Sequence, residues 1–188
     1  ATMESERVVR VYESRILRRN PLVEWLMGIS FEAEYLTIVN AAKLTGSETV
    51  LDLACGTGIY ARPLAHTLNR GRVIGLDLSL PMLSYARRRA QAEGLDNLTL
   101  IHSDAGSLHF PDKCFDVVNC CGALHLFPDV AGVLAEISRV LKPGGRFTVA
   151  TFRKREGWLS EQVVLARRRL TGVNAFRATQ LEADFNQA

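Results

Sequence analysis

The stretch Val50–Tyr60, VLDLACGTGIY, decides the fold of this chain. It begins as a short apolar run typical of a buried strand, passes through Gly56 and Gly58, and continues into a helical pattern that reaches about Leu68. A strand, a glycine turn and a helix bring the backbone close to a nucleotide, and a Cβ in the turn would push that ligand away. The sequence therefore predicts a nucleotide-binding unit.

Two acidic residues narrow the kind of nucleotide that this unit would bind. Asp52 lies just before the glycines, where its carboxylate would repel a pyrophosphate and attract an amine or hydroxyls. Asp77 ends the next apolar run, Val73–Asp77, where an acidic side chain accepts hydrogen bonds from both ribose hydroxyls. The pocket therefore suits a nucleoside that carries a ribose and a positive charge but no phosphate.

Apolar runs of strand length alternate with helical patterns through the middle of the chain. Helices are expected after the N-caps Ser79 and Asp129, the first ending at Gly94 and the second at Pro143–Gly145. Such alternation predicts an α/β fold: a Rossmann-like, doubly wound, mostly parallel sheet with helices on both faces. The expected strands are 49–54, 72–77, 98–102, 115–119 and 146–151.

The sequence predicts helices on both sides of this core. Residues 4–19 have helical spacing, and a further helix is expected from the N-cap Ser30 to about Leu44, where Gly46 stops it. We therefore divide one domain into three parts. These are an N-terminal helical cap and substrate lid at 1–46, a nucleotide-binding core at 47–152 and a C-terminal helical segment at 153–188.

Four motifs, in this order and spacing, resemble the class I S-adenosylmethionine (SAM)-dependent methyltransferases. They are DLACGTG from Asp52, GLDLS from Gly75, FDVVN from Phe115 and LKPGGRF from Leu141. Over Val50–Ala150 the chain is most similar to the small-molecule branch that includes the ubiquinone- and menaquinone-biosynthesis C-methyltransferases. The resemblance implies an enzyme that methylates a small molecule by in-line transfer, with SAM as cofactor and S-adenosylhomocysteine (SAH) as product.

The resemblance also implies roles for individual residues. Asp77 would take the ribose hydroxyls, Asp104 the adenine amine, and Tyr12 or Arg15 the ligand's carboxylate; Asp104 also fits a turn and Tyr12 an apolar helix face. His125 is expected at the mouth of the pocket, in the acceptor loop 122–128, either as a general base or as an ordinary polar residue. The residues implied to contact the cofactor are Tyr12, Asp52, Ala54, Cys55, Gly56, Gly58, Asp77, Leu78, Met82, Asp104, Ala105, Cys120 and Cys121.

Length and composition argue against several other classes of protein. The 188 residues, 47% of them hydrophobic, suffice for one domain with a core, and a net charge of +3 is too small to imply a nucleic-acid partner. No apolar run reaches the length of a membrane span. Cys55, Cys114, Cys120 and Cys121 have neither disulfide nor zinc spacing, so we expect reduced, mostly buried thiols in a cytoplasmic protein, and no metal site.

The strand pattern stops after Arg153, although the resembling family continues with two more strands. The strand at 146–151 would then be an apolar edge open to pairing. Three explanations stay open: a chain that continues beyond residue 188, a partner at this edge, which could be a second copy in a homodimer, and a natural short form. We favour the first of them.

Two other functions remain in competition. An NAD(P)-dependent oxidoreductase shares the glycine turn and the distal acid, but it would need a neutral residue in place of Asp52 and a third glycine in place of Ala61. A non-catalytic SAM-binding or interaction module fits the short C-terminal region. Titrations with SAM and with NADH distinguish the oxidoreductase from a methyltransferase. An assay of methyl transfer distinguishes the non-catalytic module from a methyltransferase.

Overall fold

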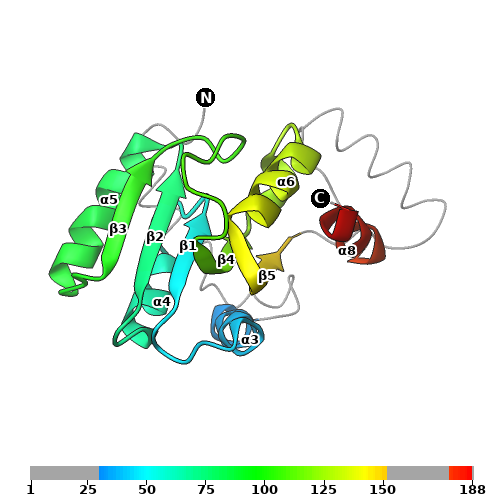
Figure 1. Ribbon diagram of the computed structural model, residues 1–188. Coiled ribbons are helices and arrows are strands. Elements are labelled where there is room, and N and C mark those ends of the chain that lie inside the picture. Colours follow the sequence, from blue (N-terminus) through cyan, green and yellow to red (C-terminus); the bar gives the residue numbers. More distant parts are fainter. Residues whose placement is uncertain (1–29, 152–177, 188) are drawn as a thin grey trace.

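The computed structural model describes residues 30–151 and 178–187, and a parallel β-sheet forms the centre of this part of the chain (Figure 1). The strand order is β3-β2-β1-β4-β5, so the chain runs outward from β1 to β3 and then returns across the middle of the sheet to β4. This confirms the predicted doubly wound α/β fold. The strands are β1 (Thr49–Leu53), β2 (Arg72–Asp77), β3 (Leu98–His102), β4 (Phe115–Cys121) and β5 (Leu141–Ala150).

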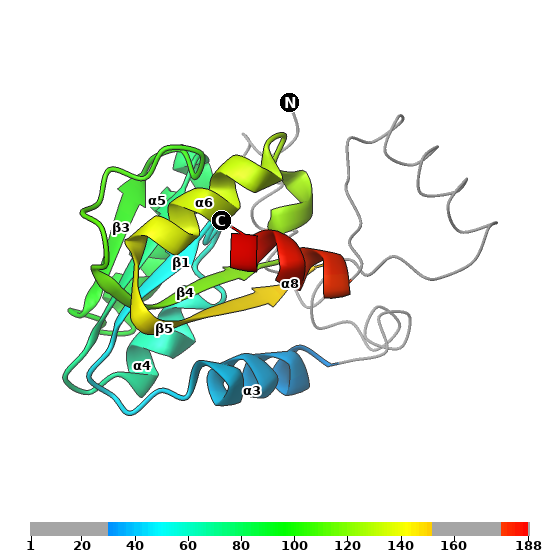
Figure 2. The same cartoon turned by 45° about the vertical axis from the view of Figure 1, so that its right-hand side comes forward.

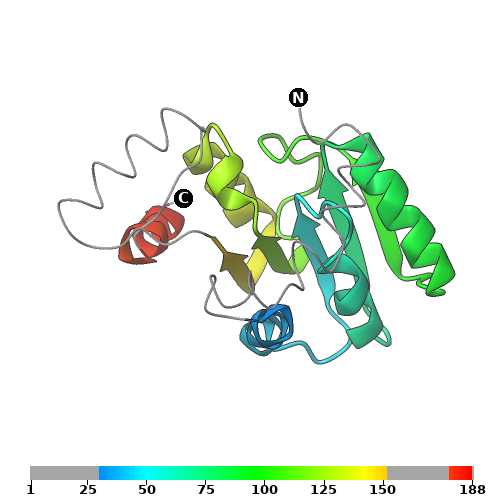
Figure 3. The ribbon, with the colours of Figure 1, turned by 180° about the vertical axis from the view of Figure 1, so that it is seen from behind.

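Helices cover both faces of the sheet (Figures 2 and 3). One apolar core joins the sheet to α3 (Phe31–Ala42), α4 (Ala61–Thr67) and α5 (Leu80–Ala92). The other joins it to α6 (Val130–Val140) and α8 (Ala178–Gln187). Side chains alternate between the two faces of a strand. In β1, Val50 therefore packs in the core with α3, α4 and α5, and Leu51 packs in the core with α6 and α8.

The three predicted N-caps are confirmed. The side chains of Ser30, Ser79 and Asp129 each accept a hydrogen bond from a backbone N–H three residues further on, which satisfies a donor at the start of α3, α5 and α6. Helix α5 packs on the sheet through a buried face that includes Met82 and Leu83.

Three predicted boundaries were wrong. Helix α3 ends at Ala42, where Lys43 takes a left-handed conformation with φ 47°, so Gly46 lies beyond the stop. Strand β4 extends to Cys121 because pairing with β5 continues to that point. Strand β5 begins directly after α6, at Leu141, and Pro143–Gly145 lies in a register shift inside it rather than at the end of the helix.

Helix α8 lies beside α6 and covers part of β5. Leu181 is buried, and the Phe185 ring centroid lies 5.2 Å from that of Phe147 on β5. Among the described residues β5 pairs with β4 alone, and no helix there is long and apolar enough to cross a membrane. The helix expected at 4–19, with Tyr12 and Arg15, lies outside the described ranges, as do residues 153–177 of the expected C-terminal helical segment.

Glu48 ties together the turn between α3 and β1. Its carboxylate accepts hydrogen bonds from Thr45 N at 2.8 Å, Thr45 Oγ1 at 2.6 Å, Gly46 N at 2.9 Å and Ser47 N at 3.1 Å. Burial raises the pKa of Glu48, but these hydrogen bonds to the charged form outweigh it and hold the pKa at about 2. The ionised carboxylate therefore stabilises the fold.

We expect Glu48→Gln to lower the free energy of unfolding by about 3 kcal/mol at pH 7. Because the folded pKa lies below the unfolded value of 4.5, this stabilisation is complete above pH 4.5 and is lost as the pH falls towards 2. Urea unfolding from pH 7 downwards should show the two proteins converging. The exposed Glu32→Gln variant is the control, and a gap independent of pH would contradict the assignment.

Candidate functional site

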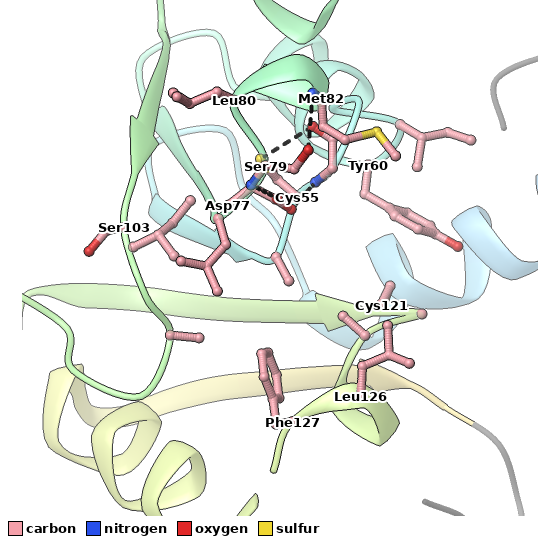
Figure 4. Close-up of a pocket in the computed structure, with 18 of the residues that line it drawn as sticks. Cys55, Tyr60, Asp77, Ser79, Leu80, Met82, Ser103, Cys121, Leu126 and Phe127 are labelled. Carbon is pink, nitrogen blue, oxygen red and sulfur yellow. Dashed lines mark hydrogen bonds between the residues drawn. The ribbon is translucent and has the colours of Figure 1, made fainter. Parts of the chain in front are cut away.

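A cavity of about 600 Å³ opens at the carboxyl ends of the central strands (Figure 4). The chain after β1 turns to one face of the sheet and the chain after β4 to the other, so the two loops diverge and leave a crevice. The volume falls within the range of small-molecule sites. The wall is mostly apolar and comes from four segments, 54–60, 76–82, 103–105 and 121–127.

The glycine turn forms one side of the cavity. Ala54, Gly56 and Gly58 all have positive φ, at 54°, 54° and 74°. A Cβ added to Gly56 would meet no atom within 4 Å, so the backbone there borders open space. A Cβ on Gly58 would instead lie 3.4 Å from the Cβ of Ala86 on α5. Gly56 therefore leaves room for a ligand, whereas Gly58 allows close packing of the turn on a helix.

Asp77 is fixed on the cavity wall beside this turn. Its Oδ2 accepts a hydrogen bond from Gly56 N at 2.7 Å, and its Oδ1 accepts one from Ser79 N at 2.8 Å (Figure 4). Each carboxylate oxygen can accept a further hydrogen bond. The side chain thus links the glycine turn to the start of α5 and keeps acceptor capacity for ligand hydroxyls.

Asp52, which we expect to contact the cofactor, lies beneath the cavity rather than on its wall. It is 1% exposed, and its Oδ1 accepts a hydrogen bond from Asn119 Nδ2 at 2.6 Å because β1 and β4 place the two residues side by side. Asn119 Oδ1 in turn accepts hydrogen bonds from Thr148 Oγ1 at 2.9 Å and Cys121 Sγ at 3.1 Å. Burial, with the negative charge of Asp77, raises the pKa of Asp52 to about 7.

We expect Asp52→Asn to stabilise the ligand-free protein at pH 8. The folded pKa lies above the unfolded value of 3.8, so the stability contributed by protonated Asp52 is complete below pH 3.8 and is lost as the pH rises through 7. Asparagine removes the buried charge and keeps an acceptor for Asn119. Thermal unfolding should show a gain in Tm of about 5 °C at pH 8 and a smaller gain at pH 5. The exposed Asp96→Asn variant should change little, and a lower Tm for Asp52→Asn at pH 8 would contradict this account.

Asp104 and Cys120, also expected to contact the cofactor, do not line the cavity, and neither does Gly58. Asp104 Oδ1 accepts a hydrogen bond from Gly106 N at 2.9 Å, which is the turn arrangement weighed above as the alternative. Cys120 belongs to the core on the α6 face of the sheet, while the next residue, Cys121, faces the cavity.

His125 does not reach the cavity wall either. The short 3₁₀ helix η1 (Leu124–Leu126) turns His125 inward, where it is buried and its Nδ1 lies 3.3 Å from Thr151 Oγ1. The same turn exposes Leu126, which lines the cavity together with Phe127 (Figure 4).

Most of the remaining predicted residues meet at the cavity. Those that line it are Ala54, Cys55, Gly56, Asp77, Leu78, Met82, Ala105 and Cys121. The loop 122–128, expected to contact the acceptor, also lines the cavity, through Gly122, Ala123, Leu126 and Phe127. The other lining residues were not predicted, although most of them directly neighbour predicted residues along the chain, and this adjacency was the available signal. They are Ile59, Tyr60, Leu76, Ser79, Leu80, Pro81 and Ser103.

Burial favours the neutral thiol form of Cys55 and Cys121, which line the cavity, and of Cys120 behind it. Burial raises the pKa of the Cys55, Cys120 and Cys121 thiols, so they are neutral and poor nucleophiles at physiological pH. All four cysteines of the chain are free thiols, as expected. Within residues 30–151 and 178–187, no group of His, Cys, Asp and Glu side chains is arranged to hold a metal ion.

Comparisons with known proteins identify what the core is similar to. A family model for a methyltransferase domain matches residues 50–145. A demethylmenaquinone methyltransferase of Geobacillus kaustophilus is 36% identical over 146 residues, which are 76% of this chain and 61% of that protein. The chain therefore spans about six tenths of the length of the curated relatives it matches.

Solved structures share the fold. The YcgJ protein of Bacillus subtilis superposes with a TM-score of 0.74 at 28% identity, over 83% of this chain and 67% of that one. A SAM-dependent methyltransferase of Aquifex aeolicus superposes with a TM-score of 0.61 over 73% of this chain and 79% of the other; at 24% identity, this likeness shows the fold alone.

Proposed function

Since this chain belongs to the class I SAM-dependent methyltransferases, whose cofactor is SAM, we propose that it transfers a methyl group from SAM to a small-molecule acceptor. One observation carries the proposal: the Gly56 backbone borders open cavity space while its N–H is held by the Asp77 carboxylate. This pairing offers a ligand close backbone approach and a hydroxyl acceptor at the same place.

Each part of SAM is assigned to a group of described residues at the cavity. We assign the ribose hydroxyls to Asp77, whose oxygens have acceptor capacity left, and the amino-acid end to the turn Ala54–Gly56. We assign the adenine plane to the apolar surface of buried Met82, and the edge of the base to the backbone at Ala105. The acid on the wall favours a cationic nucleoside over one that carries a pyrophosphate.

The bound cofactor would supply a methyl group already activated by the positive sulfur, so the chain contributes mainly alignment and exclusion of water. Leu126 and Phe127 present an apolar wall from the loop after β4. This wall favours a flat, largely apolar acceptor. The names of the curated relatives give demethylmenaquinone as the compound they methylate, and we propose an acceptor of this chemical type.

His125 enters the proposal as the general base for an acceptor that must lose a proton. His125 lies on the same loop as Leu126. If the acceptor replaced Thr151 as the partner of Nδ1, the imidazole ring could accept the proton of the acceptor. His125→Asn should lower kcat about 100-fold while the Kd for SAM stays unchanged. Turnover at the wild-type rate would remove His125 from the mechanism.

The test of the proposed function is methyl transfer from labelled SAM to a panel of phenols, reduced quinones and amines. We expect saturable transfer to at least one reduced quinone or phenol, with SAH formed in equal amount. Binding of SAM without transfer to any acceptor would favour the non-catalytic module. Binding of NADH in place of SAM would favour the oxidoreductase.

We further propose a cytoplasmic location. The support is chemical: free, neutral thiols fit a reducing compartment.

A further inference from the structure

Glu136 and Arg139, one turn apart on α6, hold the loop that connects β3 to β4. The guanidinium of Arg139 donates Nη2 to Leu108 O at 2.8 Å and Nη1 to both Phe110 O at 2.8 Å and Asp112 Oδ1 at 2.7 Å. It also donates Nε and Nη2 to the two oxygens of Glu136, at 2.8 and 2.9 Å. A single side chain thus fixes three points of the loop.

Glu136 completes this arrangement by accepting a hydrogen bond from Leu108 N at 2.7 Å. The pair therefore holds both the N–H and the C=O of Leu108, whose side chain is 4% exposed and belongs to the α6 core. The hydrogen bond from Arg139 lowers the pKa of Glu136, as expected for a bidentate ion pair. With Arg139 31% and Glu136 23% exposed, the pair is shielded better than a surface salt bridge.

The segment held in this way leads directly into the cavity wall. Ser103 and Ala105 line the cavity, and Ala105 is buried three residues before Leu108. On the other side, Ser103 N donates to Asp77 O at 3.2 Å. The wall segment is thus fixed at the sheet by β2 and at the far end by α6, although neither Glu136 nor Arg139 lines the cavity.

We propose that Glu136 and Arg139 are positioning residues that fix Ser103 and Ala105 and so determine selectivity for the nucleobase of the cofactor. The proposal rests on the proposed function, which places adenine against Ala105. A base held against a fixed backbone is recognised by the pattern of donors and acceptors on its edge, and a mobile backbone loses this discrimination. Adenine and hypoxanthine differ in that pattern at the six-position and its neighbouring ring nitrogen.

Arginine is required because its donors are spread over a planar fork. Nε, Nη1 and Nη2 here reach acceptors on α6 and on three loop residues at once, whereas the lysine ammonium places all its donors at one point. Arg139→Lys therefore keeps the charge and loses the fork. Arg89→Lys is the matched control, since Arg89 also pairs with a glutamate, the C-cap Glu93 of its own helix, but lies outside the cavity and the loop.

The experiment measures the Kd for SAH and for S-inosylhomocysteine, which carries hypoxanthine, by titration calorimetry. We expect wild type and Arg89→Lys to prefer SAH by about 10-fold or more, and Arg139→Lys to reduce that preference to about 3-fold or less. The kcat at saturating SAM should stay near the wild-type value. Asp112→Ala, which removes one exposed acceptor, should act in the same direction with smaller effect and provides the test if Arg139→Lys fails to fold.

An unchanged preference in Arg139→Lys, or in Asp112→Ala when that is the folded variant, would overturn the proposal. So would a wild type that binds both compounds equally. Neither of these results affects the proposed function, which fails if the wild-type protein binds neither SAM nor SAH, or if it binds SAM and transfers no methyl group to any acceptor.

Discussion

Replacing Gly56 with alanine is expected to raise the Kd for SAM about 100-fold, which corresponds to about 2.7 kcal/mol of binding free energy. The Gly56 backbone has φ 54° and borders open space in the cavity wall, so the new methyl group would occupy the volume that the ligand needs. The left-handed conformation adds about 1–2 kcal/mol of strain in any residue with a Cβ. Calorimetric titration with SAM measures the effect on binding.

The experiment must distinguish the backbone strain caused by Gly56→Ala from the loss of space for the ligand. Gly94→Ala is the matched control, because Gly94 has φ 67°, has no atom within 4 Å of an added Cβ, and follows α5 away from the cavity. Both variants should lose similar thermal stability, while only Gly56→Ala should lose affinity. Equal Kd values for the two variants would show that the turn does not approach the cofactor.

Asp77→Asn is expected to weaken SAM binding by a similar factor of about 100. The carboxylate accepts hydrogen bonds from Gly56 N and Ser79 N on its two oxygens, and an amide can offer only one oxygen to these two donors. The variant thus loosens the glycine turn or the start of α5, and it also removes an acceptor for the ribose. Direct titration gives the Kd, and SAH should be affected as strongly as SAM because both carry the ribose.

The control for this variant is Asp129→Asn. Asp129 also accepts a hydrogen bond from a backbone N–H, that of Gly132 at 3.0 Å, but it caps α6 outside the cavity, and asparagine is an equally good N-cap. Its Kd for SAM should match the wild type. If Asp77→Asn also binds SAM with the wild-type Kd, Asp77 does not hold the ribose.

The sequence predicted best what depends on short stretches of chain. A strand, a glycine turn and a helix are specified within Val50–Tyr60, and each N-cap, such as Ser79, lies three residues from its donor. The hydrogen bond from Ser79 N to Asp77 is also local, since the two residues are two positions apart. The hydrogen bond from Gly56 N to Asp77 is not local, because it spans 21 residues and depends on the pairing of β1 with β2.

Interactions set by strand register could not be predicted. Asp52 lies beneath the cavity, where it accepts a hydrogen bond from Asn119. Asn119 is 67 residues further along the chain, and the two meet only because β1 pairs with β4. The same pairing decides that Cys121, and not Cys120, faces the cavity, since a shift of one residue along a strand exchanges its two faces. The contacts of Arg139 with the loop could not be predicted for another reason, since two of its three loop acceptors are backbone carbonyls that any sequence would supply.

The central claim is that an acid on the wall and an open glycine turn together select a positively charged nucleoside. Its most direct test is a crystal structure of the protein with SAH bound. The account predicts both ribose hydroxyls within hydrogen-bond distance of the Asp77 carboxylate, and the amino-acid end over Ala54–Gly56. A ligand that lies elsewhere in the cavity, or a dinucleotide whose pyrophosphate rests on that turn, would contradict it.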